Sequence, residues 1–224
     1  MALLNTLGST HKTVSSQPVK LKKLLNKEFK IFLPILTILI IGVLYFLSYS
    51  YSPKWNFNWK GIRPEIKDSI KSLDEYGEIT SNAVGYSGRT PNQWHRQHWI
   101  LKNANKEEFL KLIEYPSGTV KAIAYEGLLR DEKFDHKFDL ITKSLNDTLT
   151  FVHYSFSYGG TAFMLSDYVI NFIGNINNEL PPSNIKDYPK LNLSKKQLAS
   201  VNNTFRMRKE KLDYYKKEYL KTIK

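Results

Sequence analysis

The sequence predicts a mainly α-helical protein, in which one N-terminal transmembrane helix precedes a small antiparallel helical domain. Two observations lead to this fold class. Residues 31–53 carry no charged side chain and begin with the apolar run IFLPILTILIIGVLYFL. From Pro64 onward, apolar residues recur at the three- and four-residue spacing that is typical of helices packed on one face.

The uncharged segment is long enough to cross a membrane. A helix rises about 1.5 Å per residue, so about 20 residues span the hydrocarbon layer of about 30 Å. A cleaved signal sequence usually has an apolar core of about 7–15 residues, which is shorter than this one. We therefore expect a retained anchor, with a cleaved signal and a buried helix of a soluble protein as the alternatives.

Residues on both sides of this segment are expected to contact lipid headgroups, because basic and amphipathic aromatic side chains favour that level. The candidates are Lys22, Lys23, Lys27, Lys30, Trp55 and Trp59. The predicted organisation is a basic cytoplasmic tail at 1–30, the transmembrane helix at 31–53, a juxtamembrane linker at 54–63 and an all-α domain at 64–224. The short basic tail favours a cytoplasmic N-terminus and an extracytoplasmic C-terminal domain, in a single-pass protein of the cell membrane.

The formal net charge of +12 is unevenly distributed along the chain. Residues 1–30 hold six basic and one acidic side chain, and residues 185–224 hold twelve basic and four acidic ones. Residues 54–184 are nearly neutral, with fifteen basic and sixteen acidic side chains. A basic face on the folded body is expected of a nucleic-acid-binding protein, so nucleic acid is not an expected partner. The absence of cysteine excludes disulfides, zinc–thiolate sites and thiol nucleophiles.

Local signals place the individual elements. A helix is expected to begin at Pro64 and to end at Gly77, and Asn105 and Glu108 have the spacing of a capping box that starts another helix. Further helices are expected over 91–103, 119–129, 134–145 and 162–174, and a long final helix is expected after a cap at Ser194. Residues 80–90 are expected to form a loop, and residues 150–158 form either a strand or a buried helix.

Two segments, 107–129 and 134–156, share a pattern of an apolar helix, a short break and a valine followed by a basic residue or histidine. Val120-Lys121 and Val152-His153 occupy the matching places, 32 residues apart. The pattern resembles the HEAT repeat, above all in TVKAIAYEGLL. The resemblance implies a short stack of helices, capped by the Pro64 helix and the C-terminal helix, whose surface binds other molecules. Another all-α arrangement and a mixed α/β fold are the alternatives.

No complete set of catalytic or metal-binding residues is recognisable. His95 and His98 lie three residues apart, but no nearby carboxylate completes a metal site and no HExxH motif is present. The run Gly85-Tyr86-Ser87-Gly88-Arg89 departs from the G-x-S-x-G nucleophile elbow at its last position. Neither catalysis nor a cofactor is therefore expected. The alternative is a metal-binding protein or enzyme whose site is built from scattered histidines, with His95, His98 and His153 at its centre.

The predicted function is that of a single-pass membrane-anchored helical-repeat protein, which acts as a protein-binding or scaffolding module. The candidate residues for contact with its protein partner are Trp94, Arg96, Trp99 and Lys121, on the outer side of the helices at 91–130. The C-terminal segment KLDYYKKEYLKTIK interleaves lysine with tyrosine. We interpret it as a packed helix with a basic outer face, and contact with lipid or nucleic acid is the alternative.

Overall fold

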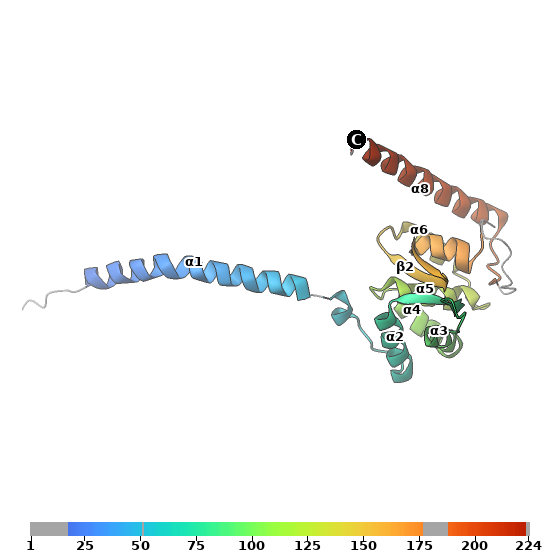
Figure 1. Ribbon diagram of the computed structural model, residues 1–224, viewed down its shortest axis with the longest axis horizontal. Helices are drawn as coiled ribbons and strands as arrows, with labels where there is room; N and C mark the ends of the chain where they lie inside the picture. Colours follow the sequence, from blue (N-terminus) through green and yellow to red (C-terminus); the bar gives the residue numbers. More distant parts are fainter. Residues whose placement is uncertain (1–17, 51, 177–187, 223–224) are drawn as a thin grey trace, which may run out of the picture. The chain divides into compact units, whose positions relative to one another are not determined.

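The computed structural model describes residues 18–50, 52–176 and 188–222, and it divides the chain into two compact units (Figure 1). The first unit extends to Ser52, and the second begins at Pro53. The first part of the predicted tail, residues 1–17, lies outside the described residues.

The N-terminal unit contains one helix, α1 (Pro18–Ser50), among its described residues. Its described side chains are those of residues 32–48, and the apolar ones among them are exposed. The side chains of Lys22, Lys23, Lys27 and Lys30, predicted to contact lipid, lie outside the described residues.

The prediction of a transmembrane helix is contradicted. Nowhere in the described part of the chain is there a helix long and apolar enough to cross a membrane. The predicted span at 31–53, the membrane as an integral partner and the single-pass location in the cell membrane, with its topology, are therefore corrected.

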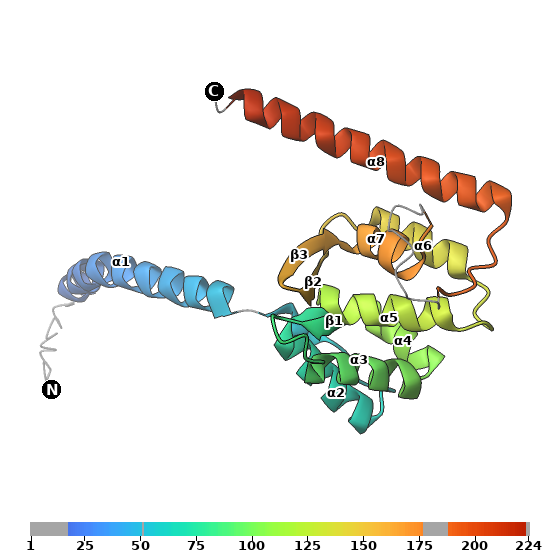
Figure 2. The same ribbon diagram turned by 45° about the vertical axis from the view of Figure 1, so that its right-hand side comes forward.

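The second unit is a mixed α/β structure (Figure 2). Its elements in chain order are η1 (Pro53–Asn56), α2 (Pro64–Tyr76), β1 (Glu78–Val84), α3 (Asn92–Asn103), α4 (Lys106–Leu112), α5 (Gly118–Arg130), α6 (Lys137–Asn146), β2 (Phe151–Ser157), β3 (Gly159–Met164), α7 (Leu165–Asp167), η2 (Tyr168–Ile173) and α8 (Lys195–Thr222).

The three strands form one sheet in the order β1-β2-β3. Strand β2 pairs in parallel with β1, where His153 faces Glu78, and antiparallel with β3, where Phe151 faces Met164. The prediction of an all-α, HEAT-like domain is therefore wrong. The segment expected as a loop at 80–90 begins as β1, and the helix expected over 162–174 begins as β3. The physical reason is that β1 and β2 are far apart in the sequence, so their pairing leaves no local signal.

Helix α5 lies at the centre of this unit. It contacts α2, α3, α4, α6, α7, β2 and η2. At its start the helix passes so close to β2 that a Cβ atom on Gly118 would overlap the carbonyl oxygen of Phe151. Ile79 and Val152 face this core from the inner side of the sheet, and Tyr154 and Phe163 pack there against Phe172 of η2.

Several local predictions are confirmed. Helix α2 begins at Pro64 and ends at Gly77, which has a positive φ of 83° and suits the left-handed C-cap position. Asn105 and Glu108 form a capping box at the start of α4. Ser194 caps α8, since its Oγ accepts a hydrogen bond from the Gln197 backbone nitrogen at 3.2 Å.

Candidate functional site

The two edges of the sheet differ in whether other elements cover them. Strand β1 forms one edge, and helix α3 covers it with two buried glutamines. Gln93 Nε2 donates to Glu78 O at 2.8 Å. With its carboxamide oriented so that both groups are satisfied, Gln97 donates to Thr80 O at 3.2 Å and accepts from Thr80 N at 2.8 Å. These side chains supply the partners that a further strand would supply, so the β1 edge is blocked.

Strand β3 forms the other edge, and no backbone bond to its outer side is recorded among the described residues. Leu165 N donates to Thr150 O at 2.9 Å, so Thr150 and Leu165 form a hydrogen-bonded pair. This pair fixes which residues of β3 are hydrogen-bonded to β2, which we call the phase of the ladder. Because bonded and non-bonded pairs alternate along an antiparallel ladder, Gly159, Thr161 and Phe163 are directed to β2. The N–H and C=O groups of Gly160, Ala162 and Met164 therefore point away from the sheet.

The sequence of β3 lacks the features that protect an exposed edge. Natural edge strands carry lysine, proline or a bulge that discourages further pairing. Strand β3 reads GGTAFM, without charge or proline, and its first four residues are exposed. Its register with β2 runs without interruption from Phe151↔Met164 to Phe156↔Gly159. We call the outer side of this strand, with its outward groups on Gly160, Ala162 and Met164, the open edge.

A shallow hollow of about 330 Å³ lies on the sheet beside the open edge. It is lined by residues of all three strands, namely Glu78, His153, Tyr154, Ser155, Gly160, Thr161 and Ala162. The Ser155 hydroxyl donates to Glu78 Oε2, so this hydroxyl is held by a carboxylate rather than by His153. The arrangement is not that of a nucleophile activated by histidine, because the base must itself accept the hydroxyl proton. Its polar groups suit hydrogen bonding to a polypeptide.

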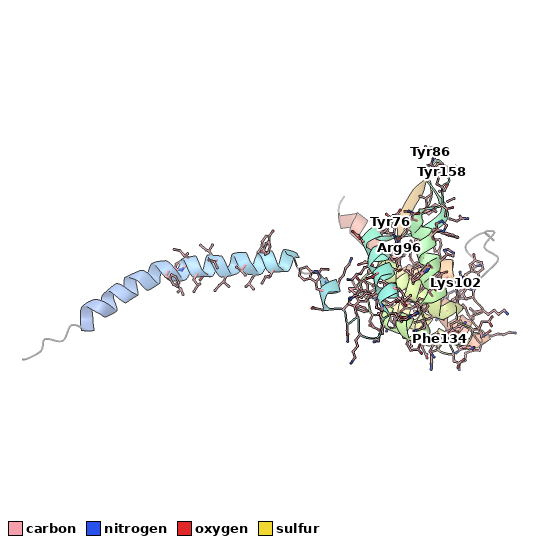
Figure 3. The ribbon with its side chains drawn as sticks, turned by 90° about the horizontal axis from the view of Figure 1, so that it is seen from below. Tyr76, Tyr86, Arg96, Lys102, Phe134 and Tyr158 are labelled. Atoms are coloured by element: carbon pink, nitrogen blue, oxygen red, sulfur yellow. The ribbon has the colours of Figure 1, made fainter. Side chains whose placement is uncertain are left out.

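Two exposed tyrosines stand at the end of the sheet (Figure 3). Tyr86 is 98% exposed and Tyr158 is 78% exposed, and their ring centroids lie 5.5 Å apart. Gly85 N donates to Ser157 O and so joins the loop after β1 to the β2–β3 turn. Ser157 has a positive φ of 42°, as a two-residue hairpin turn requires. The tyrosines therefore come from two loops that the backbone holds side by side.

The predicted partner-binding residues have different environments. Trp94, Arg96 and Trp99 lie on α3, where the Trp94 ring stacks on His98 at 3.8 Å between centroids and Arg96 donates to Gln93 Oε1. Trp99 is partly exposed. Lys121 lies on α5 and is engaged with Asp147 and Thr150.

This network joins α5 to the start of β2. Lys121 Nζ lies 2.9 Å from Asp147 Oδ2 and 3.1 Å from Thr150 Oγ1, and the Thr150 hydroxyl donates to Asp147 Oδ2 at 2.7 Å. Burial alone would raise the pKa of Asp147, but the hydrogen bonds from Thr150 and Lys121 outweigh it and hold the pKa below its usual range. The residues that follow the matching valines in the two predicted repeats therefore differ in their surroundings. Lys121 forms an ion pair with Asp147, whereas His153 is exposed.

The aromatic residues of the predicted linker have different environments. Trp59 is partly buried, with its ring centroid 4.9 Å from that of Phe57 and 5.6 Å from that of Tyr115. Lys54 Nζ lies 2.7 Å from Asp74 Oδ2, so the linker is fastened to α2. Trp55 is exposed. Trp59, one of the residues predicted to contact lipid, therefore packs against Phe57 and Tyr115.

The histidines proposed for a scattered site come from different elements, His95 and His98 from α3 and His153 from β2. His98 Nδ1 lies 2.9 Å from Trp94 O, so this ring nitrogen contacts the backbone of its own helix, α3. Within the described ranges, no group of three or more histidine, aspartate or glutamate side chains is placed to hold a metal ion.

Lys137 is a buried basic residue that the sequence analysis did not single out. Its Nζ donates to Lys190 O at 2.8 Å, and burial lowers its pKa despite the opposing effect of Asp131 and Glu132. This contact ties α6 to the segment that leads into α8.

Comparisons with models of known protein families, with curated proteins and with solved structures found no match for this chain.

The open edge was missed by the sequence analysis. A helix is predicted over 162–174, whereas residues 162–164 belong to β3. The useful signal was the alternation in TFVHYSFSY followed at once by an uncharged segment of small and apolar residues, which together are typical of a hairpin.

Proposed function

We propose that this chain is a protein-binding module that takes up an extended segment of polypeptide as a fourth strand beside β3. The observation that carries the proposal is the contrast between the two edges of one sheet. The β1 edge has its backbone groups satisfied by Gln93 and Gln97, whereas the open edge presents unprotected groups on an uncharged strand. Addition of a strand to such an edge is a recurring mode of peptide recognition.

The backbone of β3 would supply affinity, and the neighbouring side chains would supply selectivity. An added strand bonds to the outward N–H and C=O groups of Gly160 and Ala162, and its side chains alternate between the two faces of the sheet. On the outer face they meet the hollow beside His153 and the half-exposed ring of Phe151. These neighbours favour a segment that places apolar and hydrogen-bonding side chains on this face.

Selection from a library of random 12-residue peptides tests the proposal directly. The full chain is the target, and Ala162→Pro and Ala162→Val are the matched variants. The proline removes one outward N–H without removing a β2–β3 bond, so the fold tolerates it. Valine keeps that N–H and suits a strand.

We expect peptides that bind the wild type and Ala162→Val alike and that lose affinity for Ala162→Pro. Bound peptide should slow hydrogen exchange at the amides of Gly160 and Ala162, because these donors become bonded. Peptides that bind all three proteins equally, or that protect amides elsewhere only, would overturn the proposal. Circular dichroism of each variant verifies that the sheet has folded.

A further inference from the structure

We infer that the strand paired with the open edge is β3 of a second copy of this chain, running antiparallel across a two-fold axis at Ala162. The inference rests on the proposed function and names the occupant of the same site. Most soluble homo-oligomers close by such symmetry, in which residue i of one copy contacts residue j of the other and the reverse, so that a residue on the axis faces its own copy.

The absence of charge along β3 is the first support. At a two-fold axis a charged side chain faces the same charge on the other copy, which destabilises the pair. Residues 159–166 carry no charged side chain. Arg208 donates to Met164 Sδ, at the end of the strand that lies away from the axis. A neutral strand is therefore suited to pairing with itself.

The phase of the β2–β3 ladder sets the register in which the β3 strands of the two copies can pair. Outward groups belong to Gly160, Ala162 and Met164, and these residues must face one another for bonds to form. An axis at Ala162 places Ala162 opposite its own copy and Gly160 opposite Met164, so all three residues bond on each copy, with about six backbone hydrogen bonds in total. Moving the axis to Thr161 leaves Met164 outside the ladder and reduces the number to about four.

Side-chain size agrees with this register. Gly160 and Met164 lie on the same face of β3 as Ala162, because side chains alternate along a strand. Pairing across the axis therefore places Gly160, the smallest residue of this face, opposite Met164, the largest. Ala162 faces Ala162 of the second copy between them. A Cβ atom on Gly159 would meet nothing within 4 Å, so the turn leaves room beside the strand. The product is a six-stranded sheet across two copies.

Sedimentation velocity of the full chain, from about 1 to 100 µM, tests the inference. We expect the wild type and Ala162→Val to dimerise. Ala162→Pro removes both bonds that Ala162 makes across the axis, and it should weaken dimerisation by about tenfold to a hundredfold. A wild type that stays monomeric throughout this range, or a dimer that Ala162→Pro forms equally well, overturns the inference.

A charge pair tests the axis itself. Ala162→Lys and Ala162→Glu should each weaken dimerisation when alone, and a mixture of the two should regain it as a heterodimer, because opposite charges then face each other. Asn82→Lys adds the same charge on β1 and should leave the dimer intact. A mixture that dimerises no better than its components overturns the inference. Library peptides that bind a monomeric wild type would leave the strand-binding function standing and reject only the second copy as its occupant.

Discussion

Glu108 connects three parts of the chain through one carboxylate. The side chain is 1% exposed, and it accepts hydrogen bonds from Arg63 N at 2.9 Å, Arg63 Nη2 at 2.8 Å and Asn105 N at 2.9 Å. Arg63 Nη2 also donates to Asn103 O, at the end of α3. Burial alone would raise the pKa of Glu108, but the hydrogen bonds from Arg63 and Asn105 outweigh it and hold the pKa low.

Replacing Glu108 with glutamine should lower the free energy of unfolding by about 2–4 kcal/mol at neutral pH, because a buried partner of a guanidinium loses its charge. A depressed folded-state pKa gives stability that is present above the unfolded-state pKa, about 4.3, and is lost as the pH falls. The difference between wild type and Glu108→Gln should therefore shrink between pH 7 and pH 3 in urea titrations. Glu65→Gln is the control, since Glu65 is exposed and lies 3.5 Å from Arg63. An equal loss in both variants would contradict this role.

Gln97 should matter through the strand edge that it covers. Gln97→Leu keeps a similar volume but leaves Thr80 N and O without their partner, which costs about 1–3 kcal/mol when such groups are buried. We expect a lower free energy of unfolding and faster hydrogen exchange at the Thr80 amide. His95→Leu on the exposed side of the same helix should change neither quantity. Unchanged exchange at Thr80 in Gln97→Leu would show that α3 does not block β1.

The glutamines also explain why the site could not be found from single residues. The buried residues of α3 are Gln93, Gln97 and Ile100, two of which are polar. A helix that covers a strand edge needs hydrogen-bonding side chains on its inner face, and a pattern search for apolar residues passes over them. Capping signals act within four residues, so the box at Asn105 and Glu108 was predictable and is confirmed.

At the scale of the element, the buried residues of α8 lie in its first half, among the side chains that the structure describes. Val201 and Phe205 are buried, and α8 contacts α6. Arg208 Nη1 donates to Leu145 O at 3.2 Å and so adds a bond to the end of α6. Farther along, Leu212 and Tyr214 are exposed. Figures 1 and 2 show the helix continuing past α6.

Phe205→Ala should detach α8 before the rest of the unit unfolds. The phenylalanine is 3% exposed, and its truncation typically costs about 3–5 kcal/mol in a packed site. Because the loss falls on one contact between α8 and the core, we expect faster proteolysis within α8 with little change at β2. Met207→Ala, at a side chain that is 60% exposed, is the control and should digest as the wild type does. Equal digestion of wild type and Phe205→Ala would place the anchor elsewhere.

Helices were more predictable as elements than strands, although β2 lies in the segment 150–158, for which a strand was one of two expectations. The apolar stripe of α2 and its proline and glycine ends lie within thirteen residues of one another, so the pattern contains the whole element. Strand β1 reads EITSNAV, in which only Ile79 and Thr80 are buried, because its partner and its cover come from remote segments. Such a strand is stabilised by side chains that the local sequence does not contain.

At the scale of the whole molecule, the parallel pairing of β1 with β2 is the feature that separates the observed fold from the predicted one. Residues 85–150 lie between the two strands and form α3, α4, α5 and α6. A helical stack and this arrangement contain the same amphipathic helices, so periodicity alone cannot distinguish them. The segment 107–129 covers α4 and α5, whereas the segment 134–156 covers α6 and most of strand β2.

The long crossover also predicts the order of folding. Closing a loop of about 66 flexible residues costs about 4 kcal/mol of chain entropy, so β1 should pair with β2 only after the intervening helices have shortened the connection. Ile123 on α5 and Ile79 on β1 are both buried, at 1% and 3% exposure, and Ile→Val at each should cost about 0.5–1.5 kcal/mol. In urea-dependent folding kinetics, Ile123→Val should mainly slow folding, with a φ-value above about 0.5, and Ile79→Val should mainly speed unfolding, with a φ-value below about 0.3. The reverse order would mean that the sheet nucleates first, and the open edge of β3 would then be exposed on an early intermediate rather than on the finished fold alone.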